Sequence, residues 1–302
     1  IVTGAEDEFA KALAIQTDGK YVAAGYSGND LALARYNSDG SLDTSFSADG
    51  IVTTDVNGVD RAFGMALQSD GKVVVVGSTN GGDDMLMVRY NADGSLDTSF
   101  NTTGIVTTSF DGGTRNESNT SVLIQSDGKI VVGGLTEATG RTYVIQRYNT
   151  DGTLDTSFSG DGVDRANFSA ASDYSEILAM TQQTDGRIVV AGRIWVTSAD
   201  YDYAVARYNS DGTLDTSFDT DGKLVFNNGW DDEQINDVKV RSDGKIVLVG
   251  NQEGDGIIVR LNANGSMDTS FDGNGIATLN VGSSDEFNSL SLQADSKMLV
   301  AE

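Results

Sequence analysis

Side chains that carry oxygen recur at a fixed spacing, in a motif that could bind a hard cation. In one copy, Asn91, Asp93 and Asp97 supply the oxygens and Gly94 permits a sharp bend between them. Amide and carboxylate oxygens that converge from such a bend are the ligands that Ca²⁺ prefers. The candidate calcium ligands in the four best copies are Asn37, Asp39, Asp43, Asn91, Asp93, Asp97, Asn149, Asp151, Asp155, Asn209, Asp211 and Asp215.

A positive charge beside this motif argues against calcium. The motif resembles part of the Asp-x-Asx-x-Asp-Gly-x-x-Asp calcium loops of integrin-type propellers, but the position that opens those loops is Arg89 here. Every other copy also has arginine there, at Arg35, Arg147, Arg207 and Arg260. Such a cation repels Ca²⁺ and can instead pair with Asp97 or Asp93 in a bidentate manner. We therefore favour a structural role that requires no cofactor, and keep bound Ca²⁺ as the alternative.

In the structural interpretation, the motif is a cap made of backbone turns. Asp97 is expected to cap a helical turn over the next three residues, as short polar side chains do at helix starts. Phe100 is expected to fill the gap between neighbouring repeats. The fifth copy has Asn264 and Met267 at two of the conserved positions, so a metal site there would be weaker.

The cap motif is one of two markers that divide the chain into repeats. It runs from Tyr90 to Phe100 and returns at Tyr36, Tyr148, Tyr208 and Leu261. The second marker is Gln-Ser-Asp-Gly-Lys at residues 68–72. Its relatives end at Lys20, Lys129, Arg187, Lys245 and Lys297, at intervals of 52 to 58 residues. Fixed markers at this period indicate a repeat architecture.

Each repeat contains four short segments with the composition of β-strands. In one unit these are residues 62–68, 73–77, 85–90 and 105–108, and an Asp-Gly hairpin turn joins the first two. The segment at 73–77 is apolar on both faces, as expected for a central strand of a buried sheet. Four strands repeated at this period predict one blade of a β-propeller, and a β-solenoid, whose repeats are shorter, is the less favoured alternative.

We expect one propeller domain over residues 1–302. The units are predicted at about 4–53, 54–107, 108–165, 166–225, 226–278, and 279–302 completed by residues 1–3. Residues 1–3 match a fourth strand and the last segments match first and second strands, so six blades are expected, with the ends sharing the sixth. A fragment of a larger propeller is the alternative. The chain starts at Ile1 without Met, which we interpret as a processed or trimmed product.

The markers also resemble those of a known family. Asp-Gly-Ser-Leu-Asp-Thr-Ser-Phe, then Gly-Ile-Val-Thr-Thr, then Leu-Gln-Ser-Asp-Gly-Lys, is similar to the delta-60 repeat β-propellers of large exported bacterial proteins. The resemblance covers the whole chain. It implies a propeller in a secreted or cell-surface setting, often beside adhesive or sorting modules, and it implies no enzyme activity.

Composition excludes several classes of function. The net charge of −25 argues against binding nucleic acid, whose phosphates attract Lys and Arg. The chain has no Cys and no His, which removes disulfides, thiol chemistry and the commonest general base. No apolar run is long enough to span a membrane. Asp outnumbers Glu by 36 to 9, which points to turns and caps that use the shorter side chain.

Variable loops are the predicted place for binding. The first–second and third–fourth turns are nearly constant and share one face, whereas the other loops vary and share the opposite face. The loops before the first strands are acidic, which predicts either a negative channel mouth that attracts cations or simple solvated loop tips. Aromatic residues add a second candidate. The predicted ligand-binding residues are Trp195, Tyr201, Tyr203, Trp230, Asp232 and Glu233.

These patterns favour a non-catalytic, adhesion-type module that binds a protein or glycan through its variable face, outside the cell or on its surface. No constellation of carboxylates breaks the repetition, so we expect that the chain is not an enzyme. The alternatives are a structural subunit that self-assembles into a surface layer or filament, and a carbohydrate-active enzyme, since paired carboxylates hydrolyse glycosides without His. Further domains of a larger parent protein are also expected.

Overall fold

The computed structural model describes residues 7–138, 140–165, 168, 174–197, 200–229, 232–280, 282 and 285–301. The chain divides into two compact units, one formed by Ile1–Thr139 with Gln146–Asp155 and the other by Gly140–Ile145 with Thr156–Glu302. Each unit is described by itself. Within the described residues the regular structure is β-strand, apart from one short 3₁₀ turn, η1 (Asn80–Gly82).

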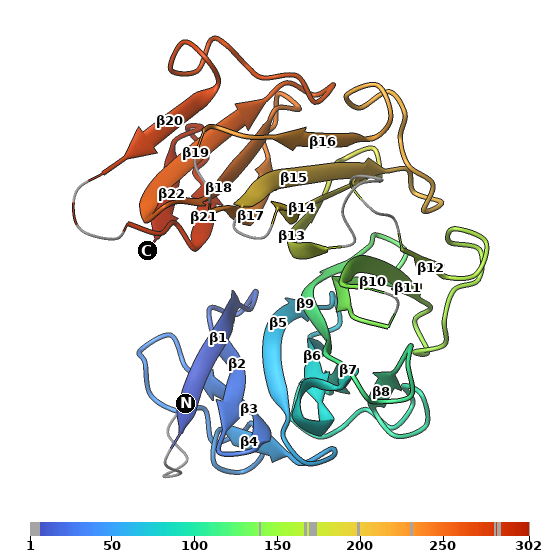
Figure 1. Ribbon diagram of the computed structural model, residues 1–302. Helices are drawn as coiled ribbons and strands as arrows, with labels where there is room; N and C mark the ends of the chain where they lie inside the picture. Colours follow the sequence, from blue (N-terminus) through green and yellow to red (C-terminus); the bar gives the residue numbers. More distant parts are fainter. Residues whose placement is uncertain are drawn as a thin grey trace. The chain divides into compact units, whose positions relative to one another are not determined.

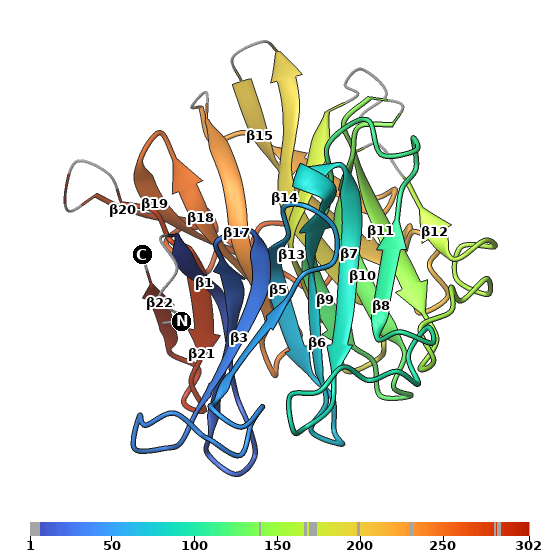
Figure 2. The same ribbon diagram turned by 90° about the horizontal axis from the view of Figure 1, so that it is seen from below.

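The first unit contains two complete four-stranded sheets and part of a third. The first sheet is β1 (Glu8–Ile15), β2 (Tyr21–Ser27), β3 (Asp30–Tyr36) and β4 (Ile51–Thr54), in that order and antiparallel. The second is β5 (Arg61–Leu67), β6 (Val73–Thr79), β7 (Asp84–Tyr90) and β8 (Ile105–Thr108). β9 (Glu117–Ile124) and β10 (Ile130–Thr136) follow. β5 lies between β1 and β9, so the first strands of successive sheets are neighbours (Figures 1 and 2).

The second unit repeats this arrangement. Its complete sheets are β13 (Ser175–Gln182), β14 (Ile188–Thr197), β15 (Asp200–Tyr208) and β16 (Lys223–Phe226), then β17 (Glu233–Val240), β18 (Ile246–Gln252), β19 (Asp255–Leu261) and β20 (Ile276–Leu279). β21 (Ser289–Leu292) and β22 (Met298–Ala301) form a two-stranded sheet. β11 (Thr142–Tyr148) and β12 (Val163–Asp164) complete the sheet order β12-β11-β10-β9.

The prediction of four-stranded antiparallel blades, five complete and a sixth that is partial, is therefore confirmed. The four strands expected in the second unit of the sequence correspond to β5–β8. The final segments form β21 and β22, as the match to first and second strands predicts. Residues 1–3, the expected fourth strand of the sixth blade, lie outside the described residues.

The core lies between successive sheets, because the middle strands are apolar on both faces. The side chains from Val73 to Val76 in β6 are at most 1% exposed. Val73 and Val75 face a cluster with Val22, Leu33 and Phe46, and the alternate valines face a second cluster that contains Phe100. Burial on both faces explains why these strands lack the apolar–polar alternation of a sheet with one wet side.

A glycine in each second strand accommodates a bulge in the first strand. In the second sheet the pairing register shifts between Ala62 and Gly64, and Gly77 lies opposite the shift. A Cβ atom on Gly77 would lie 1.8 Å from the carbonyl oxygen of Arg61, so only glycine fits. Gly25, Gly134, Gly192 and Gly250 face the same close approach in their sheets. The bulge bends the first strand in each of the five four-stranded sheets.

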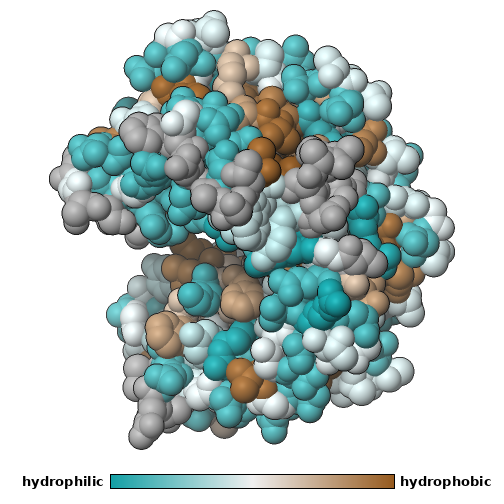
Figure 3. All heavy atoms as spheres, in the orientation of Figure 1, coloured by the Kyte–Doolittle hydropathy of each residue, from teal (hydrophilic) through white to brown (hydrophobic). Residues whose placement is uncertain are grey.

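The surface agrees with the acidic composition. On the face shown in Figure 3, hydrophilic residues predominate and hydrophobic residues form smaller separate patches. Among the residues that the structure describes, none lies in a helix long and apolar enough to cross a membrane.

Candidate functional site

The cap motif is a network around one buried carboxylate. Asp97 is 5% exposed, and its Oδ2 accepts a hydrogen bond from Arg89 Nε at 2.7 Å and an ion pair from Lys72 Nζ at 3.2 Å. Its Oδ1 accepts from the backbone N–H of Ser99 at 3.1 Å and from the Ser99 hydroxyl at 2.6 Å. The predicted pairing of Arg89 with Asp97 and the predicted turn are thus present, although a single Nε–H joins the pair instead of a bidentate contact.

The network keeps this carboxylate ionised. Burial raises the pKa of Asp97, but the hydrogen bonds from Ser99 and Lys72 and the charge of Arg89 outweigh burial and lower the pKa to about 2. The equivalent Asp43, Asp215 and Asp268 also have lowered pKa values.

Three of the caps also bond to the next repeat. Arg89 Nη1 donates a 2.6 Å hydrogen bond to the carbonyl oxygen of Thr150, in the following cap turn. Arg35 and Arg207 bond in the same way to the carbonyls of Ala92 and Ala263. Phe100 is fully buried, and the position of a Cβ on Gly152 lies 2.9 Å from its ring. The aromatic plug between neighbouring repeats is therefore observed.

The other candidate calcium ligands also have partners within the turn. Asp93 Oδ1 accepts from the backbone N–H and the hydroxyl of Ser95, and Asn91 Nδ2 donates to Ser95 and to the carbonyl of Leu96. In the fifth copy Asn264 accepts the same two bonds from Ser266, so a neutral amide serves there as well as a carboxylate. These bonds support the cap interpretation, and calcium binding stays a prediction.

Three other carboxylates come close enough together to hold a metal ion. They are Asp30, Asp55 and Asp60, whose ligand oxygens lie within 4.8 Å of one another. Asp60 already accepts hydrogen bonds from the backbone N–H of Val56 at 2.7 Å and from the Thr79 hydroxyl at 2.5 Å. Its position is thus explained by loop structure without a cation.

Four of the acids before the first strands are buried and bond to their own loops: Asp60, Glu117, Glu233 and Asp285. Glu117 is fully buried and accepts from Phe110 N–H at 2.9 Å and from the Thr136 hydroxyl at 2.5 Å. Burial raises the pKa of Glu117. Asp60, Glu233 and Asp285 accept backbone N–H bonds from equivalent loop residues. Neither a negative channel mouth nor solvated loop tips describes these four acids, because their oxygens bond to their own loops, whereas Asp7, Asp232 and Glu286 are exposed.

The predicted ligand-binding residues separate on the structure. Trp195 and Tyr201 are partly exposed cross-strand partners in β14 and β15, with ring centroids 5.4 Å apart. Tyr203 is fully buried and stacks on Phe226, so it belongs to the core. Asp232 is exposed, and Glu233 is buried and bonds to the backbone of its own loop. Trp230 lies outside the described residues.

Two arginines share one buried glutamate beside these rings. Glu176 is 4% exposed and forms ion pairs with Arg141 Nη2 and, at 3.2 Å, with Arg193 Nη2. Arg193 Nη1 donates to Gln234 Oε1 of the next repeat at 3.0 Å. The guanidinium of Arg193 lies 4.4 Å from the Tyr201 ring centroid. Two guanidinium groups therefore share one buried carboxylate beside the Tyr201 ring.

Tyr174 completes the group. Arg141 Nη1 donates to the Tyr174 hydroxyl at 2.6 Å and lies over the ring, which meets Trp195 edge-on at 4.5 Å. We call these six residues the arginine–aromatic cluster: Arg141, Tyr174, Glu176, Arg193, Trp195 and Tyr201.

The cluster breaks the repetition, contrary to the expectation from sequence. At the register positions of Glu176 and Arg193, other sheets have Ser118 with Leu135, or Gln234 with Asn251. The sequence pattern alone does not identify Arg141, Tyr174, Glu176 or Arg193 as site residues. The signal that could have found them is the opposite charge of two residues at positions that are neutral in neighbouring repeats, in the longest strand pair of the chain.

Comparison with known proteins identifies the repeats. A family model described as a domain of unknown function (DUF5122) beta-propeller matches residues 16–46, 68–100, 125–158, 183–218 and 241–271, which together are more than half of the chain. No curated protein matches the sequence.

Solved structures share the fold at low identity. A periplasmic gluconolactonase from Pseudomonas aeruginosa aligns with a TM-score of 0.54 and 12% identity, over 92% of this chain and 75% of that one. A PQQ-bound aldose sugar dehydrogenase from Streptomyces coelicolor gives 0.52 and 13%, over 93% and 84%. A Lactobacillus plantarum protein gives 0.51 and 11%, over 94% and 81%.

These comparisons correct the functional prediction. The first expectation, a non-catalytic binding or scaffold module, is contradicted because named solved structures that share the fold are enzymes. The expectation that the chain is not an enzyme has no support for the same reason. The resemblance to delta-60 repeat propellers, in contrast, agrees with the family match.

Proposed function

We propose that this chain, which belongs to the DUF5122 family of β-propellers, is a carbohydrate-active enzyme with its site at the arginine–aromatic cluster. The observation that carries the proposal is the pair of guanidiniums, Arg141 and Arg193, held on one buried carboxylate beside partly exposed aromatic rings. Guanidinium groups bind carbonyl or carboxylate oxygens, and aromatic rings pack against sugar rings. The site therefore fits a sugar-derived substrate that carries a carbonyl or carboxylate group.

The rings give the site its affinity for a sugar. Trp195 and Tyr201 are neighbours across β14 and β15 and keep part of their surface open to solvent. Aromatic faces pack against the C–H groups of a pyranose ring while the sugar hydroxyls stay available for hydrogen bonds. This arrangement would orient a sugar ring above the guanidinium of Arg193, which lies against Tyr201.

The arginines supply the electrostatic part of catalysis. A guanidinium has five N–H donors, and among the described residues the contacts of Arg193 with Glu176 and Gln234 involve three nitrogen positions and leave further N–H groups to bind a substrate oxygen. Preorganised donors of this kind stabilise the oxyanion that forms when water adds to the carbonyl of an ester or lactone. Glu176 is then a positioning residue, since it fixes both guanidiniums.

Tyr174 is the proposed proton donor. Its hydroxyl accepts a hydrogen bond from Arg141 Nη1 through an oxygen lone pair. In the proposed step Tyr174 gives its hydroxyl proton to the alkoxide that leaves when the carbon–oxygen bond of the ester breaks. Water supplies the hydroxyl of the acid product, and the proton that this water gives up returns to the Tyr174 oxygen. The proposed reaction is thus hydrolysis of a sugar lactone or sugar ester to a hydroxy acid.

Two comparisons support a sugar-derived substrate and a location outside the cytoplasm. Two solved structures that share the fold, a gluconolactonase and an aldose sugar dehydrogenase, are named for a sugar lactone and a sugar. One of them is periplasmic, which agrees with export from a bacterial cell, and we keep an extracellular or cell-surface location as part of the proposal.

The test is turnover of a substrate panel by the full chain. The panel contains glucono-δ-lactone, galactono-lactone, an acetylated xylan and methyl-esterified polygalacturonate, with acid release followed at constant pH. Arg193→Ala is expected to lower kcat/KM by about 100-fold, the usual size of losing one oxyanion donor. Tyr174→Phe is expected to lower kcat with little change in KM.

A charge-matched control separates chemistry from net charge. Arg115→Ala removes an exposed arginine whose contact is a 3.3 Å bond to the Glu137 carbonyl, and it should leave kcat/KM unchanged. The proposal is wrong if no panel member is turned over, or if activity survives both Arg193→Ala and Tyr174→Phe.

A further inference from the structure

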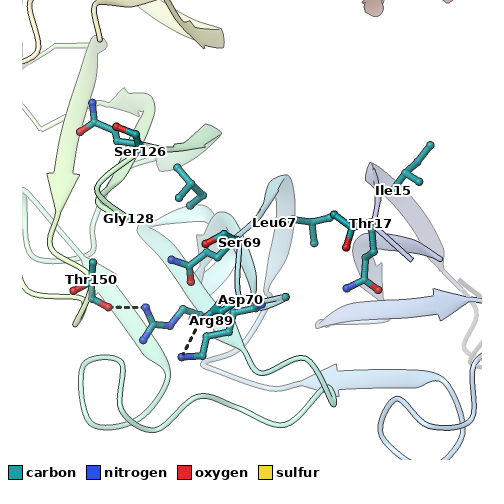
Figure 4. A pocket seen from close by; sticks show the side chains of 15 residues that line it. Ile15, Thr17, Leu67, Ser69, Asp70, Arg89, Ser126, Gly128 and Thr150 are labelled. Atoms are coloured by element: carbon teal, nitrogen blue, oxygen red, sulfur yellow. Dashed lines mark hydrogen bonds and ion pairs between the residues drawn. The ribbon is translucent and has the colours of Figure 1, made fainter. Parts of the chain in front are cut away.

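A pocket of about 680 Å³ opens in the first unit, on the side of the nearly constant turns. Figure 4 looks into it, with Ile15 and Thr17 from the end of β1, Leu67 and Ser69 from the end of β5, and Ser126 from the turn after β9. Its volume falls within the range of small-ligand sites. We expected this side of the chain to be scaffold.

Three repeats contribute the same three types of side chain, in the same order, to the wall of the pocket. An apolar side chain, a glutamine and a hydroxyl follow one another where each first strand ends, in the triplets Ile15-Gln16-Thr17, Leu67-Gln68-Ser69 and Ile124-Gln125-Ser126. Ile15 is 65% exposed, which is unusual for a large apolar side chain. The pocket therefore combines apolar surface with amides and hydroxyls at repeated positions.

The charged groups of the wall are already paired. Arg89 donates to Asp97 and to the Thr150 carbonyl, and Lys72 contacts Asp97 at 3.2 Å and Asp70 at 3.4 Å. A charged ligand would gain little binding energy from these cations, because carboxylates already neutralise them. The pocket thus favours an uncharged ligand.

Two glutamine oxygens in the wall lack partners. Gln16 Oε1 and Gln68 Oε1 are buried and accept no hydrogen bond from the described residues. A buried acceptor without a donor costs free energy, and a ligand hydroxyl reached by rotation of the amide would remove that cost. Amides that can both donate and accept are well suited to hydroxyl groups, which do the same.

We propose that this pocket binds a neutral, polyhydroxylated ligand, namely a hexopyranose unit of an uncharged glycan. The exposed side chain of Ile15 and the partly buried side chain of Leu67 pack against the C–H face of the sugar, and Gln16, Gln68 and Ser69 bond to its hydroxyls. The site belongs to the first unit and its residues take no part in the arginine–aromatic cluster, so it would add recognition of a neutral chain to the proposed enzyme without sharing its machinery.

The test is calorimetric and NMR titration of the full chain with maltohexaose, cellohexaose, laminarihexaose and, as the charged probe, hexagalacturonate. At least one neutral hexamer is expected to bind, and hexagalacturonate should not displace it. Gln68→Ala and Leu67→Ala should each weaken binding about tenfold or more, as loss of a central contact does. Ser69→Trp, an exposed turn position that does not enter the core, should abolish binding by filling the pocket.

Matched variants make the outcome specific. Gln293→Ala removes an exposed glutamine at the corresponding place after β21, and Arg193→Ala removes the cluster arginine. Both should bind the neutral hexamer as the unmodified chain does. The proposal is overturned if no neutral hexamer binds at millimolar concentration, or if binding persists in Ser69→Trp, or if Arg193→Ala abolishes it.

Discussion

The cap motif and the arginine–aromatic cluster are both built on an arginine beside a buried carboxylate, yet they differ in what else the arginine touches. Arg89 bonds Asp97 and the backbone of the next cap turn, and the same pair recurs in every complete repeat. Arg193 bonds Glu176 and lies against a partly exposed ring, in a combination that occurs at none of the equivalent register positions. Repetition thus marks the cap motif as architecture, and a departure from repetition marks the proposed catalytic site.

Removing one arginine from each region should show this difference in stability. Arg89→Ala leaves Asp97 buried with Lys72 alone and removes the bond to Thr150, so the free energy of unfolding should fall by about 3 kcal/mol. Arg193→Ala leaves Glu176 paired with Arg141, and the expected loss is about 1 kcal/mol. Chemical denaturation followed by circular dichroism measures both values.

The exposed Arg115→Ala variant serves as the reference, with an expected change within about 0.5 kcal/mol. Equal losses for Arg89→Ala and Arg193→Ala would show that the cluster is as structural as the caps. The free energy of unfolding would then not distinguish the caps from the arginine–aromatic cluster.

Acid should weaken the caps. The pKa of Asp97 is about 2 in the folded chain and about 3.9 in an unfolded one, so its contribution is complete above pH 4 and is lost as the pH falls toward 2. The melting temperature should therefore drop steeply between pH 4 and pH 2. Scanning calorimetry of the chain and of Asp97→Asn, whose profile should be flatter, tests the assignment.

Calcium should have the smallest effect. The carboxylates of the caps already accept bonds from arginine, lysine, serine and backbone groups. Adding millimolar Ca²⁺, or EDTA, is expected to leave the melting temperature unchanged. A rise of many degrees that EDTA reverses would show that a cation displaces those partners and that the calcium alternative is right.

The sequence was sufficient for the repeated parts, because repetition reveals which residues every unit needs. The position of Arg89 within the cap, eight residues before Asp97, is enough to predict their pairing. Strand spacing alone could not separate Tyr201 from Tyr203, which share a face of β15. In the structure Tyr203 is fully buried and stacks on Phe226 in the core, whereas Tyr201 is partly exposed.

The cluster required information that a linear pattern does not contain. Glu176 and Arg193 meet through the pairing of β13 with β14, and a bulge near Ile177 shifts that register. Arg141 and Tyr174 reach the same place from segments 33 residues apart. The buried acids were misread for a similar reason, since their bonding partners are N–H groups of their own loops.

The bond from Arg35, Arg89 and Arg207 to a carbonyl in the following cap turn suggests how such a chain could lengthen or shorten during evolution. The acceptor is backbone and the packing surface for the phenylalanine is a glycine, so neither depends on which copy follows. A duplication of one whole period would carry its own donor and its own acceptor. New units could therefore be inserted without any coordinated substitution in their neighbours.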